Sequence, residues 1–461
     1  MNLKRKLVLG LSLVGLIGLA SCSRSNDDSC FLPHANPEVG IVNFPENAEL
    51  VQNGELVLKA SIKDVTGSGS YYWLVDGQRV EDDKLVNEKD STFTFRQEEP
   101  GDYEIALIYE NAGRTQKFSQ SIHVFGQFRD GTFVLNEGAF GHGNGTLIFI
   151  SPQGKLMADA YKSINGRELG INTQDLFIAD SKIYFISQAI PAEGLGNSEG
   201  LLAVAHAETL QRIASYNEEL EDLSNPTHLV VVGDFAYIRD GKGIYRFNLV
   251  SKELDFVEGT EKAVKNRMAL VGNKIFSWSA KKLMVIEAGA TKLAKVIEMD
   301  QKISGLVKSA DNQLWISTKG AEATIIKLNP KDYSMQKSVV TVGGLSEGWG
   351  ATPAFGAVGE ILYFTNNTTT IYRHNFSTAV SEDVAKLSDY VTENISMTYN
   401  NLGVDPQNGN IYINTIQGFG EAYKQNNISV LNFEGEKGVL VENYKDQTAF
   451  PAGVFFTASF K

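Results

Sequence analysis

The sequence predicts an all-β protein in which a β-sandwich precedes a seven-bladed β-propeller closed by the C-terminal strand. Short runs of alternating apolar and polar residues, separated by turn residues, predict strands throughout. A pair of such strands then recurs roughly every 40 to 50 residues, which is the period of a propeller blade. The first of these units lacks its innermost strand, and the C-terminus ends in a run of the missing kind.

Residues 1–21 have the features of a lipoprotein signal peptide. Lys4, Arg5 and Lys6 precede an apolar run, and small residues stand directly before Cys22. The run is too short to span a bilayer stably. We therefore expect Cys22 to be the lipidated first mature residue and its acyl chains to be the membrane anchor. An ordinary signal peptide or a short membrane anchor is the alternative.

Residues 22–35 are polar and predict a flexible tether. The tether loosely resembles the acidic segment that directs lipoproteins to the outer face of the outer membrane in gut Gram-negative anaerobes. That resemblance implies an outer-membrane, lipid-anchored and surface-exposed protein, with the periplasmic side as the alternative. Because Cys22 is expected to carry lipid, Cys30 is left alone, so we expect no intrachain disulfide.

The chain is acidic, with a formal net charge of -13. Removing Lys4, Arg5 and Lys6 with the signal peptide gives -13 - 3 = -16 for the mature chain. Phosphate binding needs a basic surface, so nucleic acid is disfavoured as a partner.

Residues 36–125 predict an antiparallel β-sandwich of five strands. The predicted strands are residues 55–62, 70–77, 91–97, 101–110 and 118–125. Trp73, followed later by the Pro100-Gly101-Asp102-Tyr103 turn, resembles the PKD-like, immunoglobulin-type module. The resemblance implies that Trp73 packs between the two sheets. We expect this module to be a spacer, with carbohydrate contact as a minor alternative.

Residues 126–461 predict the propeller. Six strand pairs share a large residue at the centre of the second strand: Tyr184, Tyr237, Phe276, Trp315, Tyr363 and Tyr412. Residues 132–138, 145–152 and 155–161 are interpreted as the second, third and fourth strands of the first blade. Residues 450–458 are expected to supply its innermost strand, which would remove the exposed sheet edges. An open array, or one with six or eight blades, is the alternative.

The first blade carries a family resemblance. Residues 131–178 are similar to the opening of the YncE-like/DUF5074 propellers of surface lipoproteins, through Leu135-Asn136-Glu137-Gly138, Phe140, Gly143-Asn144-Gly145, Asn165-Gly166-Arg167, Leu169-Gly170 and Gln174. The broad family includes surface propellers that hand corrinoids to TonB-dependent transporters. The sandwich before the propeller departs from the shortest corrinoid binders.

No motif predicts catalysis, a metal or a cofactor. Residues 344–348 match G-x-S-x-G, but they lie in a glycine-rich loop rather than between a strand and a helix. The six histidines lack the spacing of metal ligands. We therefore expect a protein that is not an enzyme.

The long loops between second and third strands, and between blades, crowd one face of a propeller. Long loops commonly carry function, and these are rich in aromatic residues. The ligand-binding candidates are Asn136, Glu137, Phe140, Asn165, Arg167, Trp349, Tyr399, Phe419 and Tyr423. The alternative is structural: the two asparagines cap turns, Arg167 pairs with Glu168 or Glu137, and half of the aromatics only pack the loops.

The leading functional hypothesis is a non-enzymatic surface binder. It would capture a small molecule or a glycan on the loop-rich face and feed a TonB-dependent outer-membrane receptor. A propeller lyase or hydrolase using acidic or arginine side chains near the centre, and a protein-interaction or adhesion scaffold, are the two alternatives.

Overall fold

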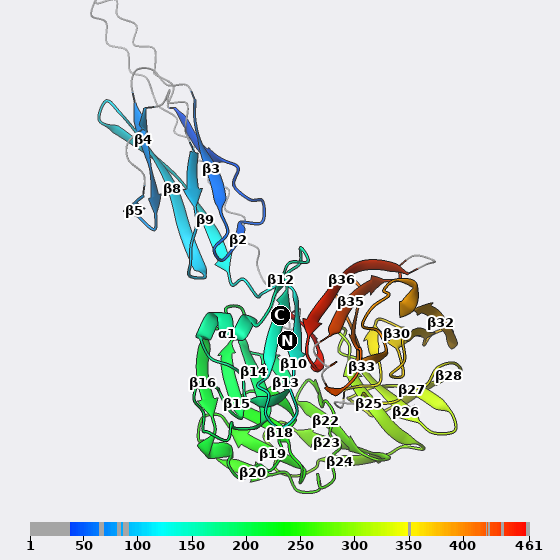
Figure 1. Cartoon of the computed structure of the whole chain (residues 1–461). Coiled ribbons are helices and arrows are strands. Elements are labelled where there is room, and N and C mark those ends of the chain that lie inside the picture. Colours follow the sequence, from blue (N-terminus) through cyan, green and yellow to red (C-terminus); the bar gives the residue numbers. More distant parts are fainter. Residues whose placement is uncertain are drawn as a thin grey trace, which may run out of the picture. The chain divides into compact units, whose positions relative to one another are not determined.

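The computed structural model describes residues 37–63, 69–80, 84–85, 92–348, 352–420, 422, 425–434 and 438–457, and strands dominate it (Figure 1). The chain forms two compact units. The second unit comprises Glu49–Glu55, Arg96–Asp102 and His123–Lys461. The first contains Leu56–Phe95 and Tyr103–Ile122. Among the described residues, no helix is long and apolar enough to cross a membrane.

The N-terminal strands form two sheets. One sheet has the order β1 (Glu38–Val42), β3 (Leu56–Lys63) and β7 (Thr92–Phe95). The other has the order β2 (Glu49–Val51), β9 (Arg114–Phe125), β8 (Gly101–Asn111), β4 (Ser70–Val75) and β5 (Gln78–Arg79), with β6 (Lys84–Leu85) also paired to β4. Trp73 of β4 is fully buried and stacks on Phe93 of β7, with 5.3 Å between ring centroids. The expected core role of Trp73 is confirmed.

The sandwich differs from the sequence prediction in two respects. The five expected strands are present, but the short strands β1, β2, β5 and β6 were not expected, and β2 pairs with β9 in parallel rather than antiparallel. Strand β2 has only three residues, Glu49–Val51, none of them fully buried. So short a run leaves almost no alternating pattern in the sequence.

Residues 132–456, within the second unit, form seven four-stranded sheets. Each is given from its innermost to its outermost strand. The first is β37 (Pro451–Phe456), β10 (Thr132–Asn136), β11 (Thr146–Ile150) and β12 (Leu156–Met157). The second is β13 (Ile171–Ala179), β14 (Lys182–Ala189), β15 (Leu202–His206) and β16 (Arg212–Tyr216). The third is β17 (His228–Val232), β18 (Phe235–Arg239), β19 (Ile244–Asn248) and β20 (Leu254–Phe256).

The remaining four sheets repeat this order. The fourth sheet is β21 (Ala269–Val271), β22 (Lys274–Ser279), β23 (Lys282–Glu287) and β24 (Lys295–Glu298). The fifth is β25 (Lys302–Lys308), β26 (Leu314–Lys319), β27 (Ala323–Leu328) and β28 (Met335–Val340). The sixth is β29 (Gly356–Val358), β30 (Ile361–Phe364), β31 (Thr370–Asn375) and β32 (Val380–Lys386), and the seventh is β33 (Met397–Val404), β34 (Ile411–Ile416), β35 (Asn426–Asn432) and β36 (Val439–Thr448). The innermost strands of most neighbouring sheets contact one another, as β13 does with β17 and β33 with β37, which is the arrangement of a β-propeller.

The core lies between neighbouring sheets. The six large residues that the sequence places at the centre of second strands are all buried. Trp315, for example, packs with Leu362 and Phe364 of the next sheet. Phe133, Phe149 and Phe185 join the first and second sheets in the same way. Burying these rings removes apolar surface from water at about 25 cal/mol per Å², so each sheet stabilises its neighbours.

The C-terminal strand completes the first sheet, as the sequence predicts. Strand β37 runs antiparallel to β10, with Phe455 opposite Phe133. The backbone N–H of Gly131 also donates to the Thr457 hydroxyl across 2.7 Å. The two ends of the propeller sequence are therefore hydrogen-bonded to each other.

One predicted strand is shorter than expected. Residues 155–161 are not a full fourth strand, because β12 covers only Leu156–Met157 and is followed by the helix α1 (Ala160–Asn165). Asp159 adopts a left-handed conformation with φ 51°, which turns the chain before the helix. Tyr161 is then buried edge-to-face against Phe185, with ring centroids 5.4 Å apart. Tyr161, which completes the alternating pattern expected of a strand, is thus part of a helix and is buried from there.

Candidate functional site

The candidate site lies on the loop-rich face, which we define as the face formed by the loops joining second to third strands and the connections between sheets. Alternation of antiparallel strands places both kinds of connection at the same end of each sheet. Residues 137–145, between β10 and β11, and residues 417–425, between β34 and β35, are two such loops. The connection from β36 to β37 contains Phe450 and reaches the same face.

Glu137 follows β10 and is buried. One carboxylate oxygen accepts a hydrogen bond from the Tyr399 hydroxyl across 2.8 Å, and the other accepts one from the Gln174 side-chain amide. Burial raises the pKa of Glu137 above its ordinary value, while these hydrogen bonds and the nearby Lys265 oppose the rise. The carboxylate is therefore held in place by groups from two other sheets.

A stack of three aromatic rings lies beside Glu137; we call Tyr399, Phe450 and Phe419 the aromatic stack. Ring centroids are 5.8 Å apart between Tyr399 and Phe450, and 6.5 Å apart between Phe450 and Phe419. The backbone carbonyl of Phe450 accepts the Glu137 N–H across 2.9 Å. Phe419 is 56% exposed, whereas Tyr399 is 9% exposed. The stack thus extends from the buried carboxylate to the surface.

Tyr399 differs from the expectation in one respect. It was expected in a loop, but it belongs to the innermost strand β33. Its phenol is buried and bonded to Glu137, so its role is to position that carboxylate. Phe140, in the loop after β10, is 85% exposed as the ligand-binding interpretation requires.

Asn136 does not have a free side chain. It is 4% exposed, its amide donates to the Thr146 hydroxyl across 2.9 Å, and its carbonyl accepts a hydrogen bond from the Thr448 hydroxyl. Thr448 ends β36, just before the closing strand. Asn136 therefore joins the first sheet to the end of the last one, and it does so from strand β10 rather than by capping a turn.

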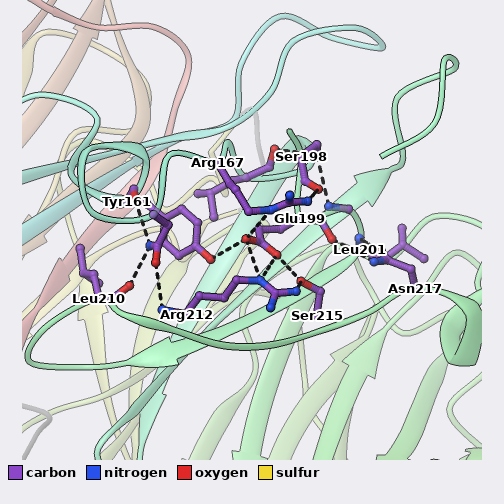
Figure 2. Close-up of polar contacts among 12 residues, drawn as sticks. Tyr161, Arg167, Ser198, Glu199, Leu201, Leu210, Arg212, Ser215 and Asn217 are labelled. Carbon is purple, nitrogen blue, oxygen red and sulfur yellow. Dashed lines mark hydrogen bonds and ion pairs between the residues drawn. The ribbon is translucent and has the colours of Figure 1, made fainter. Parts of the chain in front are cut away.

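Arg167 and Asn165 belong to a second cluster, centred on the buried carboxylate of Glu199 (Figure 2). The Glu199 side chain has 0% exposure. It accepts hydrogen bonds from Arg167 Nε at 3.2 Å, from Arg212 Nε at 2.9 Å and from the Tyr161 hydroxyl at 3.1 Å. Ser215 donates to the same carboxylate. The expected partners of Arg167, Glu168 and Glu137, are wrong.

Asn165 fastens the end of α1 to the neighbouring sheet. Its amide donates to the carbonyls of Tyr161 and Leu210, across 3.0 and 2.8 Å, and its carbonyl accepts the Arg212 N–H across 2.9 Å. The side chain therefore uses both of its amide N–H donors and one of the two lone pairs on its carbonyl oxygen. The Asn165 side chain thus has a structural role in this cluster.

Two site candidates and the lipidation site lie outside the described residues: Trp349, Tyr423 and Cys22. Within those that are described, no three His, Cys, Asp or Glu side chains are grouped so that they could hold a metal ion. Glu347 of the G-x-S-x-G match pairs with Lys319 across 2.5 Å, in the connection between β28 and β29.

Sequence reasoning missed several residues of the site. Gln174 enters only through the family resemblance, and Phe450 only as the start of the closing strand. Lys265 and Arg267, which precede β21, carry no sequence signal. Arg267 lies 3.4 Å from the carboxylate of Asp175 and 4.0 Å from the ring centroid of Phe455. Only the closed ring brings these sheets together.

Several solved structures are similar to this chain, and the first of them supports the fold. A quinonprotein alcohol dehydrogenase-like protein from Bacteroides thetaiotaomicron is similar at 17% identity and a TM-score of 0.55, with 91% of this chain and 99% of that chain covered. BamB from Moraxella catarrhalis has 10% identity and a TM-score of 0.40, covering 70% of this chain and 85% of that one. The Neurospora crassa Pan2 WD40 domain has 10% identity and a TM-score of 0.40, covering 58% and 78%.

The sequence comparisons give one family. No curated protein matches the chain significantly. Residues 130–457 match the family described as a domain of unknown function, DUF5074, and this range contains the seven four-stranded sheets of the second unit. The match covers well over half of the chain, and so the protein belongs to the DUF5074 family of β-propellers.

Proposed function

We propose that this protein is a non-enzymatic, lipid-anchored surface protein that captures a ligand on the loop-rich face of its propeller. The ligand, a small molecule such as a corrinoid or a glycan, would then pass to a TonB-dependent outer-membrane transporter. The observation that carries the proposal is the aromatic stack. Phe419 is 56% exposed although it is a large apolar ring, and it stacks on Phe450 with 6.5 Å between ring centroids.

A held, exposed ring beside fixed polar groups suits recognition. Aromatic faces contribute large apolar area to a planar or ring-shaped ligand. Exposed apolar surface of this kind is otherwise a cost to a soluble domain. Phe140, 85% exposed in the loop after β10, adds a second ring to the same face. The hydrogen bond from Tyr399 to Glu137 holds the buried end of the stack in place, which lowers the entropy lost on binding.

The remaining parts of the proposal concern architecture and location. The seven four-stranded sheets support a seven-bladed, YncE-like propeller, and the buried Trp73 supports a PKD-like spacer. The pattern of a lipoprotein signal peptide in residues 1–21, directly before Cys22, supports lipidation and an outer-membrane location. A surface location would place the loop-rich face where it can meet both a ligand and a transporter.

Calorimetry of the purified protein against cobalamin, cobinamide and a glycan panel tests the proposal. Phe419→Ala should weaken binding of the recognised ligand by roughly 1 to 4 kcal/mol, the range for hot-spot aromatics. The control is Val250→Ala, which removes an apolar side chain that is 71% exposed at the turn after β19, on the opposite face. Absence of heat with every ligand, or equal binding by Phe419→Ala and wild type, would favour the interaction-scaffold alternative.

A further inference from the structure

Phe450 belongs both to the aromatic stack and to the segment that closes the ring. Its ring contacts those of Tyr399 and Phe419, at centroid distances of 5.8 and 6.5 Å. Tyr399 lies in β33 and Phe419 in the loop between β34 and β35, so both are parts of the seventh sheet. Phe450 instead directly precedes β37, the innermost strand of the first sheet. The middle ring of the proposed binding surface is therefore in place only when the C-terminal segment is docked.

The backbone at Phe450 is held by both neighbouring sheets. Its φ angle of 53° lies in the left-handed region, which a bulky residue adopts only where its surroundings impose that conformation. The Phe450 carbonyl accepts the N–H of Glu137, directly after β10 of the first sheet, across 2.9 Å. The side-chain amide of Asn400, in β33 of the seventh sheet, donates to the Pro451 carbonyl across 2.9 Å. The closing segment is thus fixed to both sheets at the position of the stack.

The pairing of β37 with β10 is irregular at the same point. Residues 453–456 lie opposite residues 132–135 in regular register, but the register then shifts, and Pro451 lies opposite Asn136. A residue inserted by such a shift is left unpaired, and proline has no N–H to donate. Segments with fewer backbone hydrogen bonds open first. We therefore expect β37 to detach first at its loop-rich end, which is the end that carries Phe450.

We propose that ligand binding on the aromatic stack and closure of the ring are coupled through Phe450. A ligand that lies on Phe419 gains the contact with Phe450 only while β37 is docked, so it binds the closed ring more tightly than a ring whose C-terminal strand has detached locally. Because a ligand shifts the equilibrium toward the state that it prefers, β37 opens less often in the loaded protein than in the free protein. This inference rests on the proposed function, because it assigns a structural consequence to ligand binding on the same face.

Hydrogen–deuterium exchange of the full-length protein with the neutral aromatic probe N-phenyl-1-naphthylamine tests the coupling. A ligand that binds only the closed state, at a free concentration roughly ten times its Kd, slows exchange through opening about tenfold. We expect a slowing of several-fold, up to about tenfold, in residues 449–453 beside the stack and also in residues 454–457. The second segment ends at Thr457, whose hydroxyl accepts the Gly131 N–H at the opposite end of the strand, so contact with the probe does not explain its protection.

Local detachment of β37 must be separated from global unfolding, because any ligand of the folded protein slows exchange that requires global unfolding. The comparison is therefore made with amides of β29 and of other innermost strands that exchange at the same rate as residues 454–457 in the free protein. These strands do not close the ring, so the probe should slow their exchange less. Equal slowing in the matched amides, or no slowing in residues 454–457, would overturn the inference.

Phe450→Leu tests the role of the ring itself, because leucine keeps an apolar side chain before β37 but removes the aromatic contacts. At equal occupancy by the probe, this variant should lose the slowing in residues 454–457, whereas Phe450→Tyr, which retains a ring, should keep it. The control is Val441→Ala on the outer strand β36, where the side chain is 51% exposed, and it should behave as wild type. Melting curves show whether each variant is folded, and Phe450→Met replaces Phe450→Leu if the latter is not. Slowing that persists in Phe450→Leu would contradict the coupling.

Phe419→Ala separates the failure of this inference from the failure of the proposed function. If Phe419→Ala weakens probe binding but the probe does not slow residues 454–457 in wild type, only the coupling fails. If Phe419→Ala binds the probe as tightly as wild type, the probe does not bind on the aromatic stack and the proposed function fails.

Discussion

At the residue scale, the buried acids of the propeller differ in how completely their charge is compensated. Glu199 accepts hydrogen bonds from two arginines, a tyrosine and a serine. Asp175 accepts a backbone N–H from Leu229 across 3.2 Å and has Arg267 at 3.4 Å, but its Oδ1 atom is buried with no hydrogen-bond partner in the described structure. The hydrogen bonds and ion pairs that a buried carboxylate forms decide whether its charge stabilises the fold.

Removal of the Glu199 carboxylate should destabilise the propeller strongly. Glu199→Ala leaves Arg167 and Arg212 without their shared acceptor, and breaking a buried ion pair typically costs about 3–5 kcal/mol. The measurement is the free energy of unfolding from urea titration. Asp300→Ala is the matched control, because that side chain is 81% exposed in its pair with Lys337 and should change little. A Glu199→Ala variant as stable as wild type would contradict the structural role.

Asp175 should make stability depend on pH. Burial raises its pKa from 3.8 to about 7, with Arg267 opposing the rise. Between these two values the folded state holds a proton that the unfolded chain has released, so the free energy of unfolding should fall as the pH rises from about 4 to about 7. Above pH 7 this contribution is lost. Glu137, whose pKa is also raised, should add to the same slope.

Asp175→Asn tests this assignment because it is neutral at every pH. Urea unfolding at pH 5 and at pH 8 should show a smaller difference in this variant than in wild type. A wild-type stability that rises over this range, or an unchanged slope in Asp175→Asn, would show that the carboxyl group is ionised in the folded state.

Part of the candidate site could be predicted at this scale, and part could not. Exposure of Phe140 and Phe419 follows from aromatic residues in long loops. The partner of Arg167 could not be found, because Glu199 is brought near by a separate loop, while the nearer candidate Glu168 pairs with Lys162 across 2.6 Å. Sequence separation gives no information about which carboxylate a long side chain reaches.

At the scale of elements, period-two patterning located the strands with buried centres well. The second strands are the clearest, because each carries a large buried residue such as Trp315 or Tyr237. Short elements were missed or misassigned for a physical reason. The pattern in residues 155–161 fits a strand, yet the left-handed Asp159 and the burial of Tyr161 give a helix. Backbone turns of that kind leave little trace in an apolar pattern.

The closing strand should be essential to the propeller. Val454 of β37 is 7% exposed and packs with Val134 of β10, so Val454→Asp would bury a charge at the seam. We expect loss of cooperative propeller unfolding, with the sandwich retained, and deletion of residues 449–461 should act in the same way. Val441→Asp is the control, since Val441 is 51% exposed on the outer strand β36. A Val454→Asp or truncated protein with the wild-type melting temperature would contradict closure by β37.

At the scale of the whole molecule, the proposal places the chain on a membrane through its first mature residue. Cys22→Ala should abolish lipid labelling and release the protein into the soluble fraction. Metabolic labelling with a fatty acid and membrane fractionation measure both effects. Cys30→Ala is the matched control and should leave labelling and fractionation unchanged. Membrane association that persists in Cys22→Ala would indicate a different anchor.

The central claim is that the loop-rich face of the propeller binds the ligand, and hydrogen–deuterium exchange of the full-length protein tests it most directly. The experiment compares the free protein with the protein saturated by whichever of the calorimetric ligands binds. We predict slower exchange in residues 137–145, 417–420 and 448–453, which lie on the loop-rich face and carry or adjoin the aromatic stack. The opposite face, residues 309–313 and 329–336, should be unchanged. Protection confined to that opposite face or to the sandwich would contradict the claim.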